Sequence, residues 1–167
     1  MKNFTLPKDG GLIEEGLPNG VKHTFERIPA HIYEDETVAS ERLARKVIDS
    51  IKACEGTFRL GLSTGSSPVA LYHSLVSHYN AGEVSFKNVE IFSIDEYYPA
   101  PADNHSRNRR LYEDFVAHVD IDPANVQIPK LTELKDSSCV TEFCNEFDRK
   151  ARGLDLLIMG MGEKGQI

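Results

Sequence analysis

Short apolar runs alternate with segments whose apolar residues repeat at helical spacing, and this alternation limits the possible folds more than any other feature. Three runs, 58–62, 89–94 and 154–159, have the length of buried strands, and a shorter one at 126–128 is expected to add a further strand. The segments between them are long enough for helices. Strands that alternate with helices predict an α/β fold with a doubly wound, mostly parallel, Rossmann-like sheet.

The intervening segments carry helix start signals. One helix is expected to follow Asp35 or Thr37. A second is expected to follow Ser67, with Pro68 at its first position, where a missing N–H costs nothing. A third helix is predicted over residues 109–119.

The last predicted helix follows Asp136. Its apolar positions repeat at helical spacing, and they are Val140, Phe143, Cys144 and Phe147. The three cysteines, Cys54, Cys139 and Cys144, have neither CxxC spacing nor an even count, so we expect buried thiols in a reducing, cytoplasmic setting. The six histidines lack the spacing of metal ligands, so no metal site is expected.

The composition is that of a globular protein and argues against two kinds of partner. The 167 residues are 40% hydrophobic and 27% charged, which suits one domain with its own core. A net charge of −7 argues against general nucleic-acid binding but leaves room for a small phosphate in a local cradle. No apolar run is long enough to span a bilayer, so no membrane partner is expected.

The chain divides into two parts. Residues 1–30 show neither a clear period nor a secretory signal, so we interpret them as an N-terminal extension. Residues 31–167 form the α/β domain. The chain ends just after the strand at 154–159 and a glycine-rich turn, where an α/β fold enters its next helix. We therefore expect residues 31–167 to be the N-terminal part of a longer domain.

The turn after the first strand has the composition of a phosphate cradle. Backbone N–H groups at a helix start are unsatisfied and carry the positive end of the helix dipole, and serine and threonine hydroxyls add donors. We take Thr64, Gly65, Ser66 and Ser67 as candidate phosphate-binding residues. A polar turn before a well-capped helix explains the same residues equally well.

Two acids, Asp95 and Glu96, follow the strand at 89–94. In open α/β sheets, ligands bind beyond the carboxyl ends of the strands. A carboxyl group at that place is expected to be partly desolvated and able to take up a proton, which makes Asp95 a candidate base. The alternative is a capping Asp beside a solvated Glu.

Two further segments allow more than one interpretation. The glycine-rich turn at 160–166 permits close approach of the backbone to a ligand, but a tight turn alone would need the same glycines. Arg107, Arg109 and Arg110 at a helix start could bind an anionic substrate, although a solvated first turn is the favoured interpretation.

Four segments together resemble the glucosamine-6-phosphate deaminase/isomerase family. Residues 60–72 are similar to its phosphate loop, residues 81–97 to the strand that delivers its catalytic Asp, and residues 118–126 to a further stretch. Residues 160–167 occupy the place of its Gly-x-Gly-x-Asp-Gly-His-Ile turn. The resemblance covers about residues 33–167, and its most specific part is the Ser-Phe-Lys-Asn…Asp-Glu-Tyr block.

The resemblance implies conversion of glucosamine 6-phosphate to fructose 6-phosphate and ammonia. A carboxylate takes the proton from C2 of the open-chain sugar and returns it to C1, and the resulting ketose imine loses ammonia to water. The resemblance makes Asp95 the base, assigns the 6-phosphate to the cradle and adds Ser106 as a residue of the substrate loop. The candidate catalytic residues are Asp95, Glu96 and Gln166, and neither a metal nor an organic cofactor is needed.

Two residues depart from the family pattern. Lys164 stands at the position of the turn's Asp, and Gln166 at that of its ring-opening His. An amide does not exchange a proton near neutral pH, so Gln166 can orient a sugar oxygen but cannot open the ring as an acid–base. Ring opening would then depend on water, on another residue or on substrate that is already open.

Three functional hypotheses stay open. An amino-sugar-phosphate isomerase/deaminase is the leading one. The related 6-phosphogluconolactonases share the fold but usually place Arg after Asp-Glu, where this chain has Tyr97. Loss of the His–Asp pair favours a non-catalytic sugar-phosphate sensor. Each hypothesis predicts a phosphosugar as partner and is compatible with a homo-oligomer. Residues 1–167 alone are expected to turn over substrate poorly.

Overall fold

The computed structural model describes residues 31, 33–98, 106–130, 134, 136–161 and 164, so the expected N-terminal extension at 1–30 lies outside the described residues. The helices and strands follow in the order α1 (Glu36–Ala53), β1 (Phe58–Leu62), α2 (Val69–Asn80), β2 (Val89–Ser93), α3 (Arg107–Asp114), β3 (Val126–Gln127), α4 (Val140–Lys150) and β4 (Leu156–Ile158). Short 3₁₀ turns lie at Val116–His118, Pro123–Asn125 and Ser137–Cys139.

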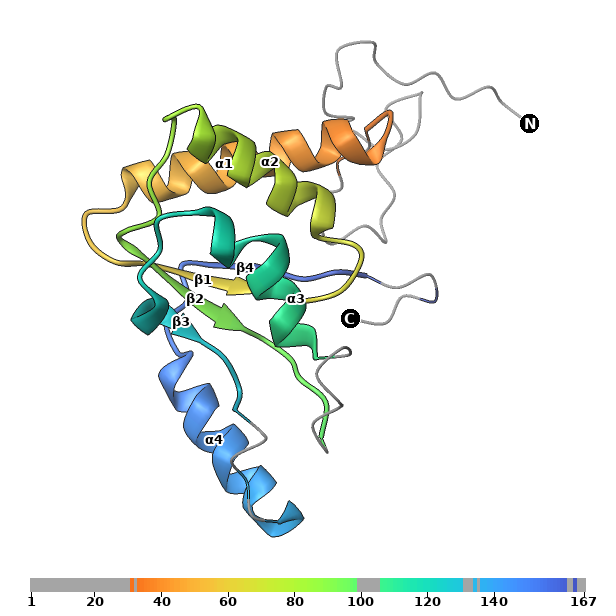
Figure 1. The fold of residues 1–167 in the computed structure, drawn as a ribbon, viewed down its shortest axis with the longest axis vertical. Coiled ribbons are helices and arrows are strands. Elements are labelled where there is room, and N and C mark those ends of the chain that lie inside the picture. Colours follow the sequence, from red (N-terminus) through yellow and green to blue (C-terminus); the bar gives the residue numbers. More distant parts are fainter. Residues whose placement is uncertain are drawn as a thin grey trace, which may run out of the picture.

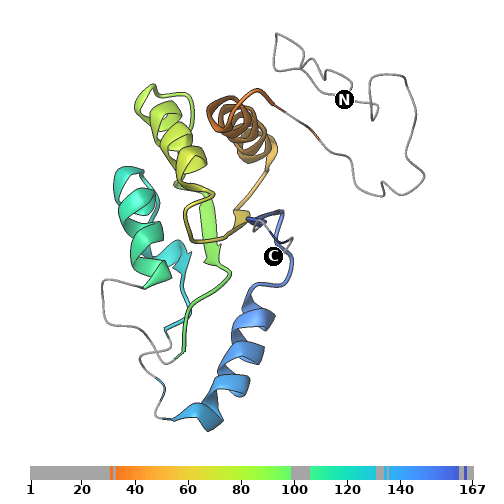
Figure 2. The ribbon, with the colours of Figure 1, turned by 90° about the vertical axis from the view of Figure 1, so that its right-hand side faces the viewer.

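The described strands form one parallel sheet in the order β3-β2-β1-β4. β1 and β2 pair in register, with Phe58 opposite Val89 and Leu62 opposite Ser93, and β4 pairs with the other side of β1. Figures 1 and 2 show α1, α2 and α3 on one side of the sheet and α4 on the other. The expected doubly wound, parallel α/β fold is therefore confirmed.

The main core lies between the sheet and the layer of α1, α2 and α3. Leu60 and Ile91 of the strands are fully buried in it. At its centre, the ring of Phe115 stacks on Tyr72 with centroids 5.4 Å apart and meets Phe86 edge-on at 5.2 Å. Large buried rings contribute both apolar area and favourable ring geometry, so this cluster holds α2 and the segment after α3 against the sheet.

A polar cluster joins α1 to α2. His78 is buried, with Nε2 3.0 Å from the Glu41 carboxylate and Nδ1 3.0 Å from Glu83. Arg45 contacts both acids, at 3.0 Å and 3.3 Å. The hydroxyl of Ser74 donates to Glu41 and, with the His78 contact, holds the pKa of that carboxyl below its ordinary value against the opposing effect of burial. The cluster fixes α2, whose N-terminus follows the predicted cradle.

The helix starts differ in part from the expectations. Asp35 is confirmed as the cap of α1, where it accepts a hydrogen bond from the Val38 amide. Ser67 is not a cap, because Pro68 occupies the N-cap position of α2 and makes no side-chain cap bond. Asp136 accepts from the Ser138 amide in the 3₁₀ turn that precedes α4, rather than capping α4 itself.

The third helix also begins earlier than expected. α3 starts at Arg107, with Ser106 as its cap, and passes into a 3₁₀ turn after Phe115, so a single helix over 109–119 is wrong. Phe115 has φ −139° and leaves the helical region, because its ring enters the core beside Tyr72. Tertiary packing therefore outweighs the local helical pattern here.

The side of the sheet that faces α4 is only partly covered. Leu157 and Met159 are 43% and 50% exposed, so the expected burial of residues 154–159 is wrong for this face. α4 buries none of its described residues, and its Cys144 is exposed, whereas Cys54 and Cys139 are half-buried free thiols. The expectation of a buried thiol thus fails at Cys144, because one short helix covers too little of the strands. None of the described helices has the length and apolar character that a membrane span requires.

We predict that Phe86→Ala lowers the free energy of unfolding by about 3–5 kcal/mol, because it leaves a cavity next to the Phe115 ring in a fully buried site. Urea denaturation measures the loss. The matched control is Tyr112→Ala, which removes a half-exposed ring and should change stability by less than about 1 kcal/mol. Equal losses in the two variants would contradict the assigned core.

Candidate active site

The loop after β1 presents backbone amides at the start of α2. Its first residue is held by β4, since the Ser63 amide donates to the Ile158 carbonyl at 3.1 Å. Gly65 has φ +146°, a conformation that side-chain-bearing residues rarely adopt. Within the described part of the chain, the amides of Gly65, Ser66 and Ser67 donate no hydrogen bond to a backbone carbonyl. These groups are therefore available to an anion, as the predicted cradle requires.

Asp95 lies directly beside this loop. The Ile94 amide donates to the Leu62 carbonyl at 3.1 Å, which extends the pairing of β1 and β2 beyond the strands. The hydroxyl of Thr64 then donates to Asp95 Oδ1 at 3.0 Å. The structure thus joins the predicted base and the predicted cradle. The Asp95 side chain is 41% exposed, so the carboxyl group is partly buried, as expected.

Arg107, the first residue of α3, completes this contact. Its Nη1 lies 3.0 Å from Asp95 Oδ2 and donates to the Thr64 carbonyl at 2.9 Å. Its Nη2 donates to the Tyr97 hydroxyl at 2.6 Å, and the guanidinium lies 4.6 Å from the centre of the Tyr97 ring. Both Asp95 oxygens are therefore engaged, Oδ1 by Thr64 and Oδ2 by Arg107.

The role of Arg107 was missed by the sequence analysis, which favoured a solvated first turn. That interpretation suits its neighbours, since Arg109 and Arg110 are both exposed and Arg109 pairs with Glu113 at 2.6 Å. The three arginines are alike in sequence. The available signal was that Arg107 directly follows the loop that leaves Asp95, but only the docking of α3 shows which side chain turns back.

Glu96 anchors the same loop. Its carboxylate accepts hydrogen bonds from the Ser106 hydroxyl at 2.7 Å, from the Arg107 and Asn108 amides at 3.2 Å each, and from the Asn108 side chain at 2.7 Å. The Tyr97 amide also donates to it, at 2.9 Å. Burial by itself raises the pKa of Glu96, but these hydrogen bonds outweigh it and hold the pKa below the ordinary value.

These contacts make Glu96 a cap of the loop and of the start of α3, whereas the alternative in the sequence analysis was a capping Asp95 beside a solvated Glu96. Its two oxygens are engaged by donors of the loop and helix start, so the geometry lends no support to the catalytic role expected for it. Ser106 is used in the same way: its hydroxyl donates to Glu96 and accepts from the Arg109 amide at 3.3 Å. The expected contact of Ser106 with substrate stays a prediction.

The third predicted segment touches the cradle at its first residue. A Cβ added to Gly160 would lie 3.5 Å from the Ser67 side chain, so the turn after β4 begins against the loop after β1. Lys164 is exposed, whereas Gln166 lies outside the described residues. The structure therefore brings together the loop at 63–67, Asp95 and Gly160, and leaves the ring-opening position undescribed.

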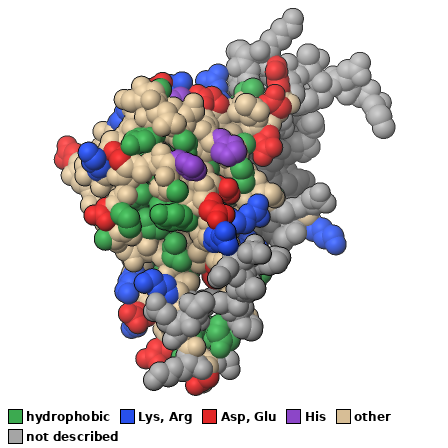
Figure 3. Space-filling model, in the orientation of Figure 1, with side chains coloured by type: hydrophobic (Ala, Val, Ile, Leu, Met, Phe, Trp, Pro, Cys, Tyr) green, Lys and Arg blue, Asp and Glu red, His purple; other side chains and the backbone are tan. Residues whose placement is uncertain are grey.

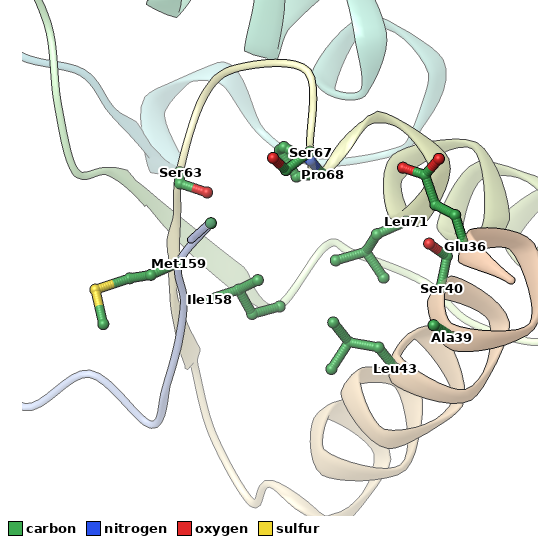
Figure 4. Close-up of a pocket in the computed structure, with 11 residues that line it drawn as sticks. Glu36, Ala39, Ser40, Leu43, Ser63, Ser67, Pro68, Leu71, Ile158 and Met159 are labelled. Atoms are coloured by element: carbon green, nitrogen blue, oxygen red, sulfur yellow. The ribbon is translucent and has the colours of Figure 1, made fainter. Parts of the chain in front are cut away.

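A pocket of about 230 Å³ lies behind the cradle. Figure 4 shows it between the first turns of α1, Leu71 of α2 and Ile158 of β4, with Ser63 and Ser67 at its edge. The Ser63 hydroxyl is buried without a hydrogen-bond partner among the described residues. The lining of the pocket is chiefly apolar, and Asp95 does not belong to that lining. The pocket is thus adjacent to the candidate site but separate from its carboxylate.

The charges elsewhere are dispersed. On the face shown in Figure 3, acidic and basic side chains alternate, and the described residues form no broad basic surface there. The described residues also hold no cluster of three or more His, Cys, Asp or Glu that could bind a metal ion. Among the described residues, the site offers backbone amides, the Thr64 hydroxyl, the Arg107 guanidinium and the Asp95 carboxylate.

Replacement of Glu96 by Gln should weaken the docking of α3, because an amide –NH₂ cannot accept the hydrogen bonds that a carboxylate accepts. The expected loss is about 1–3 kcal/mol of unfolding free energy at pH 7. A lowered folded-state pKa means that the anchor contributes fully above the ordinary value of 4.5 and is lost as the pH falls through the lowered value.

Urea denaturation from pH 7 down to pH 3 tests this. The stability of the wild type should decline more steeply than that of Glu96→Gln below the ordinary pKa, and the two curves should converge in acid. The exposed Glu55→Gln serves as control and should follow the wild type. Parallel curves for wild type and Glu96→Gln would exclude the anchor.

Comparison with known proteins identifies relatives across most of the chain. A family model described as glucosamine-6-phosphate isomerases/6-phosphogluconolactonase matches residues 34–167. A glucosamine-6-phosphate deaminase of Caenorhabditis elegans is 35% identical over 143 residues, which are 81% of this chain and 52% of the relative. A glucosamine-6-phosphate isomerase of Candida albicans is 36% identical over 140 residues, 81% of this chain and 55% of the relative. The chain thus spans about half the length of these curated relatives.

Solved structures agree with this result. A monomeric glucosamine-6-phosphate deaminase superposes with a TM-score of 0.72 at 26% identity, over 80% of this chain and 55% of that one. A 6-phosphogluconolactonase of Thermotoga maritima gives a TM-score of 0.61 at 21% identity, over 76% of this chain and 56% of that one, which shows a shared fold. From the match to residues 34–167, the chain belongs to the glucosamine-6-phosphate isomerase/6-phosphogluconolactonase family.

Proposed function

We propose that the chain takes part in the isomerisation and deamination of an amino-sugar phosphate, with glucosamine 6-phosphate as substrate and fructose 6-phosphate and ammonia as products. The observation that carries the proposal is the hydrogen bond between Thr64 and Asp95. It connects a carboxylate to a loop whose amides can hold a phosphate. Such a pair suits a substrate with an anionic group at one end and an acidic C–H near the other.

In the proposed reaction, the phosphate binds to the amides of residues 65–67, where the positive end of the α2 dipole favours negative charge. The chain of the sugar then extends toward Asp95. Its carboxylate removes the proton from C2 of the open aldehyde and delivers it to C1. The C1 oxygen gains a proton and the C2 nitrogen loses one, so that C1 becomes a hydroxymethyl group and C2 an imine. Water adds to this imine and ammonia departs, so that one water is consumed for each ammonia released.

Asp95 suits this task through its fixed position. The Thr64 hydroxyl holds Oδ1, and in the proposal the second oxygen, Oδ2, takes up the proton. General acid–base catalysis depends first on placing the base within reach of the proton. In the proposal, Gln166 orients a sugar oxygen, and ring opening proceeds through water or uses substrate that is already open. The reducing, cytoplasmic setting belongs to the same proposal.

Arg107 also keeps a second candidate function open. The 6-phosphogluconolactonases usually carry Arg after Asp-Glu, where this chain has Tyr97, yet the Arg107 guanidinium lies against the Tyr97 ring. A guanidinium therefore lies close to residue 97, the position at which the hydrolase family carries its arginine. An assay of 6-phosphogluconolactone hydrolysis, followed as acid release, distinguishes this hydrolase function from the deaminase function, which is followed as ammonia release.

We predict that, in the full-length protein, Asp95→Asn lowers the rate of ammonia release from glucosamine 6-phosphate by about 10²–10⁴-fold, the usual contribution of a general base. Asparagine is nearly isosteric with aspartate but cannot take up the proton. The control is Asp49→Asn on the outer face of α1, which should retain the wild-type rate. Activity that survives Asp95→Asn would remove the assigned base. Sugar-phosphate binding without turnover in the wild type would favour the sensor.

A further inference from the structure

The Arg107 guanidinium lies where the carboxylate and the cradle meet. One nitrogen, Nη1, bridges Asp95 Oδ2 and the Thr64 carbonyl at 3.0 Å and 2.9 Å. The same nitrogen would lie 3.9 Å from a Cβ added to Gly65, so the guanidinium borders the amides of the cradle as well. A single cation thus touches both halves of the candidate site.

The backbone of Arg107 is fixed independently of these contacts. Its amide donates to Glu96 at 3.2 Å, and its residue begins α3. The side chain can therefore move without displacing the helix. Its contacts in this structure are with one carboxylate, one carbonyl and one phenol, and its side chain is 30% exposed. A half-exposed ion pair of this kind is weak enough to be exchanged for a better partner.

A bound phosphate would be such a partner. A phosphate monoester carries up to two negative charges and offers several acceptor oxygens to the planar donor fork of an arginine, whereas Asp95 carries one charge. The ion pair with Arg107 also obstructs the proposed chemistry, because a base needs a free oxygen to take up a proton. Oδ1 already accepts from Thr64, so Oδ2 is the oxygen that must become free.

We propose, on the basis of the function above, that Arg107 is a positioning residue that couples occupancy of the phosphate cradle to the freedom of Asp95. In the structure, Arg107 pairs with Asp95 Oδ2. When a phosphate group binds to the amides of residues 65–67, the guanidinium transfers its hydrogen bonds to the phosphate and leaves Oδ2 to the substrate. Arg107 thereby selects for anionic substrates without taking part in proton transfer.

The coupling can be followed without turnover. In the full chain labelled with ¹⁵N, the Arg107 side-chain Nε–Hε signal is assigned by its absence in Arg107→Lys, and inorganic phosphate is then added. The proposal expects this signal and the amides of residues 65–67 to shift with the same midpoint. Amide shifts without a change at Arg107 overturn the coupling, and so does the absence of any amide shift, which removes the cradle itself.

Kinetics on glucosamine 6-phosphate give the second readout. Arg107→Met should raise KM about tenfold, the loss expected for one charge-assisted hydrogen bond to the phosphate. Arg107→Lys keeps the charge and should recover most of the KM, but a single ammonium cannot replace the fork, so its kcat stays below the wild type. The exposed Arg110→Met is the control and should match the wild type in both.

The two proposals fail in different ways. Joint shifts of Arg107 and the amides, together with a full-length wild-type protein that releases no ammonia, would support the coupling and overturn the deaminase. Turnover in which Arg107→Met loses stability but keeps the wild-type KM would make Arg107 a structural residue and overturn the coupling.

Discussion

The parallel pairing of β1 with β2 is the constraint on which the candidate site depends. Leu62 lies opposite Ser93, so both strands end at the same height and release their chains side by side. The Thr64 hydroxyl can then donate to Asp95, and because the two residues are distant in sequence, their separation is determined by the strand pairing. Because the core under α1, α2 and α3 is closely packed, this register is rigid, and the site inherits its geometry from the sheet.

A second layer of interactions determines where the following loop returns. Glu96 collects donors from both sides of the loop and from the start of α3, and this keeps its carboxyl ionised and engaged. Adjacent acids in the sequence thus have different tasks: Asp95 faces the cradle and Glu96 holds the helix that carries Arg107. The division is seen in their partners: Thr64 and Arg107 engage Asp95, whereas donors of the loop and of the start of α3 engage Glu96.

Much of this arrangement could be predicted from the sequence. The apolar runs located β1 and β2 closely, and the rule that ligands bind beyond strand ends placed Asp95 and the Thr64 loop at one edge. The exposure of Leu157 and Cys144 could not be predicted. An apolar stripe indicates which face of a helix or strand packs inward, but not how much of that face other elements will cover. Arg107 was missed for a related reason: its partners are distant in sequence.

The sequence by itself determined the fold class, the membership of the family and the identity of the residues that carry the proposed chemistry, because these depend on local periodicity and on short motifs. Only the tertiary structure decided their relations. It made Glu96 an anchor, left the Asp95 side chain half-buried and brought the guanidinium of Arg107 into contact with both Asp95 and the Thr64 carbonyl. Such contacts join residues from separate elements, and their geometry exists only once strand register and helix docking are established.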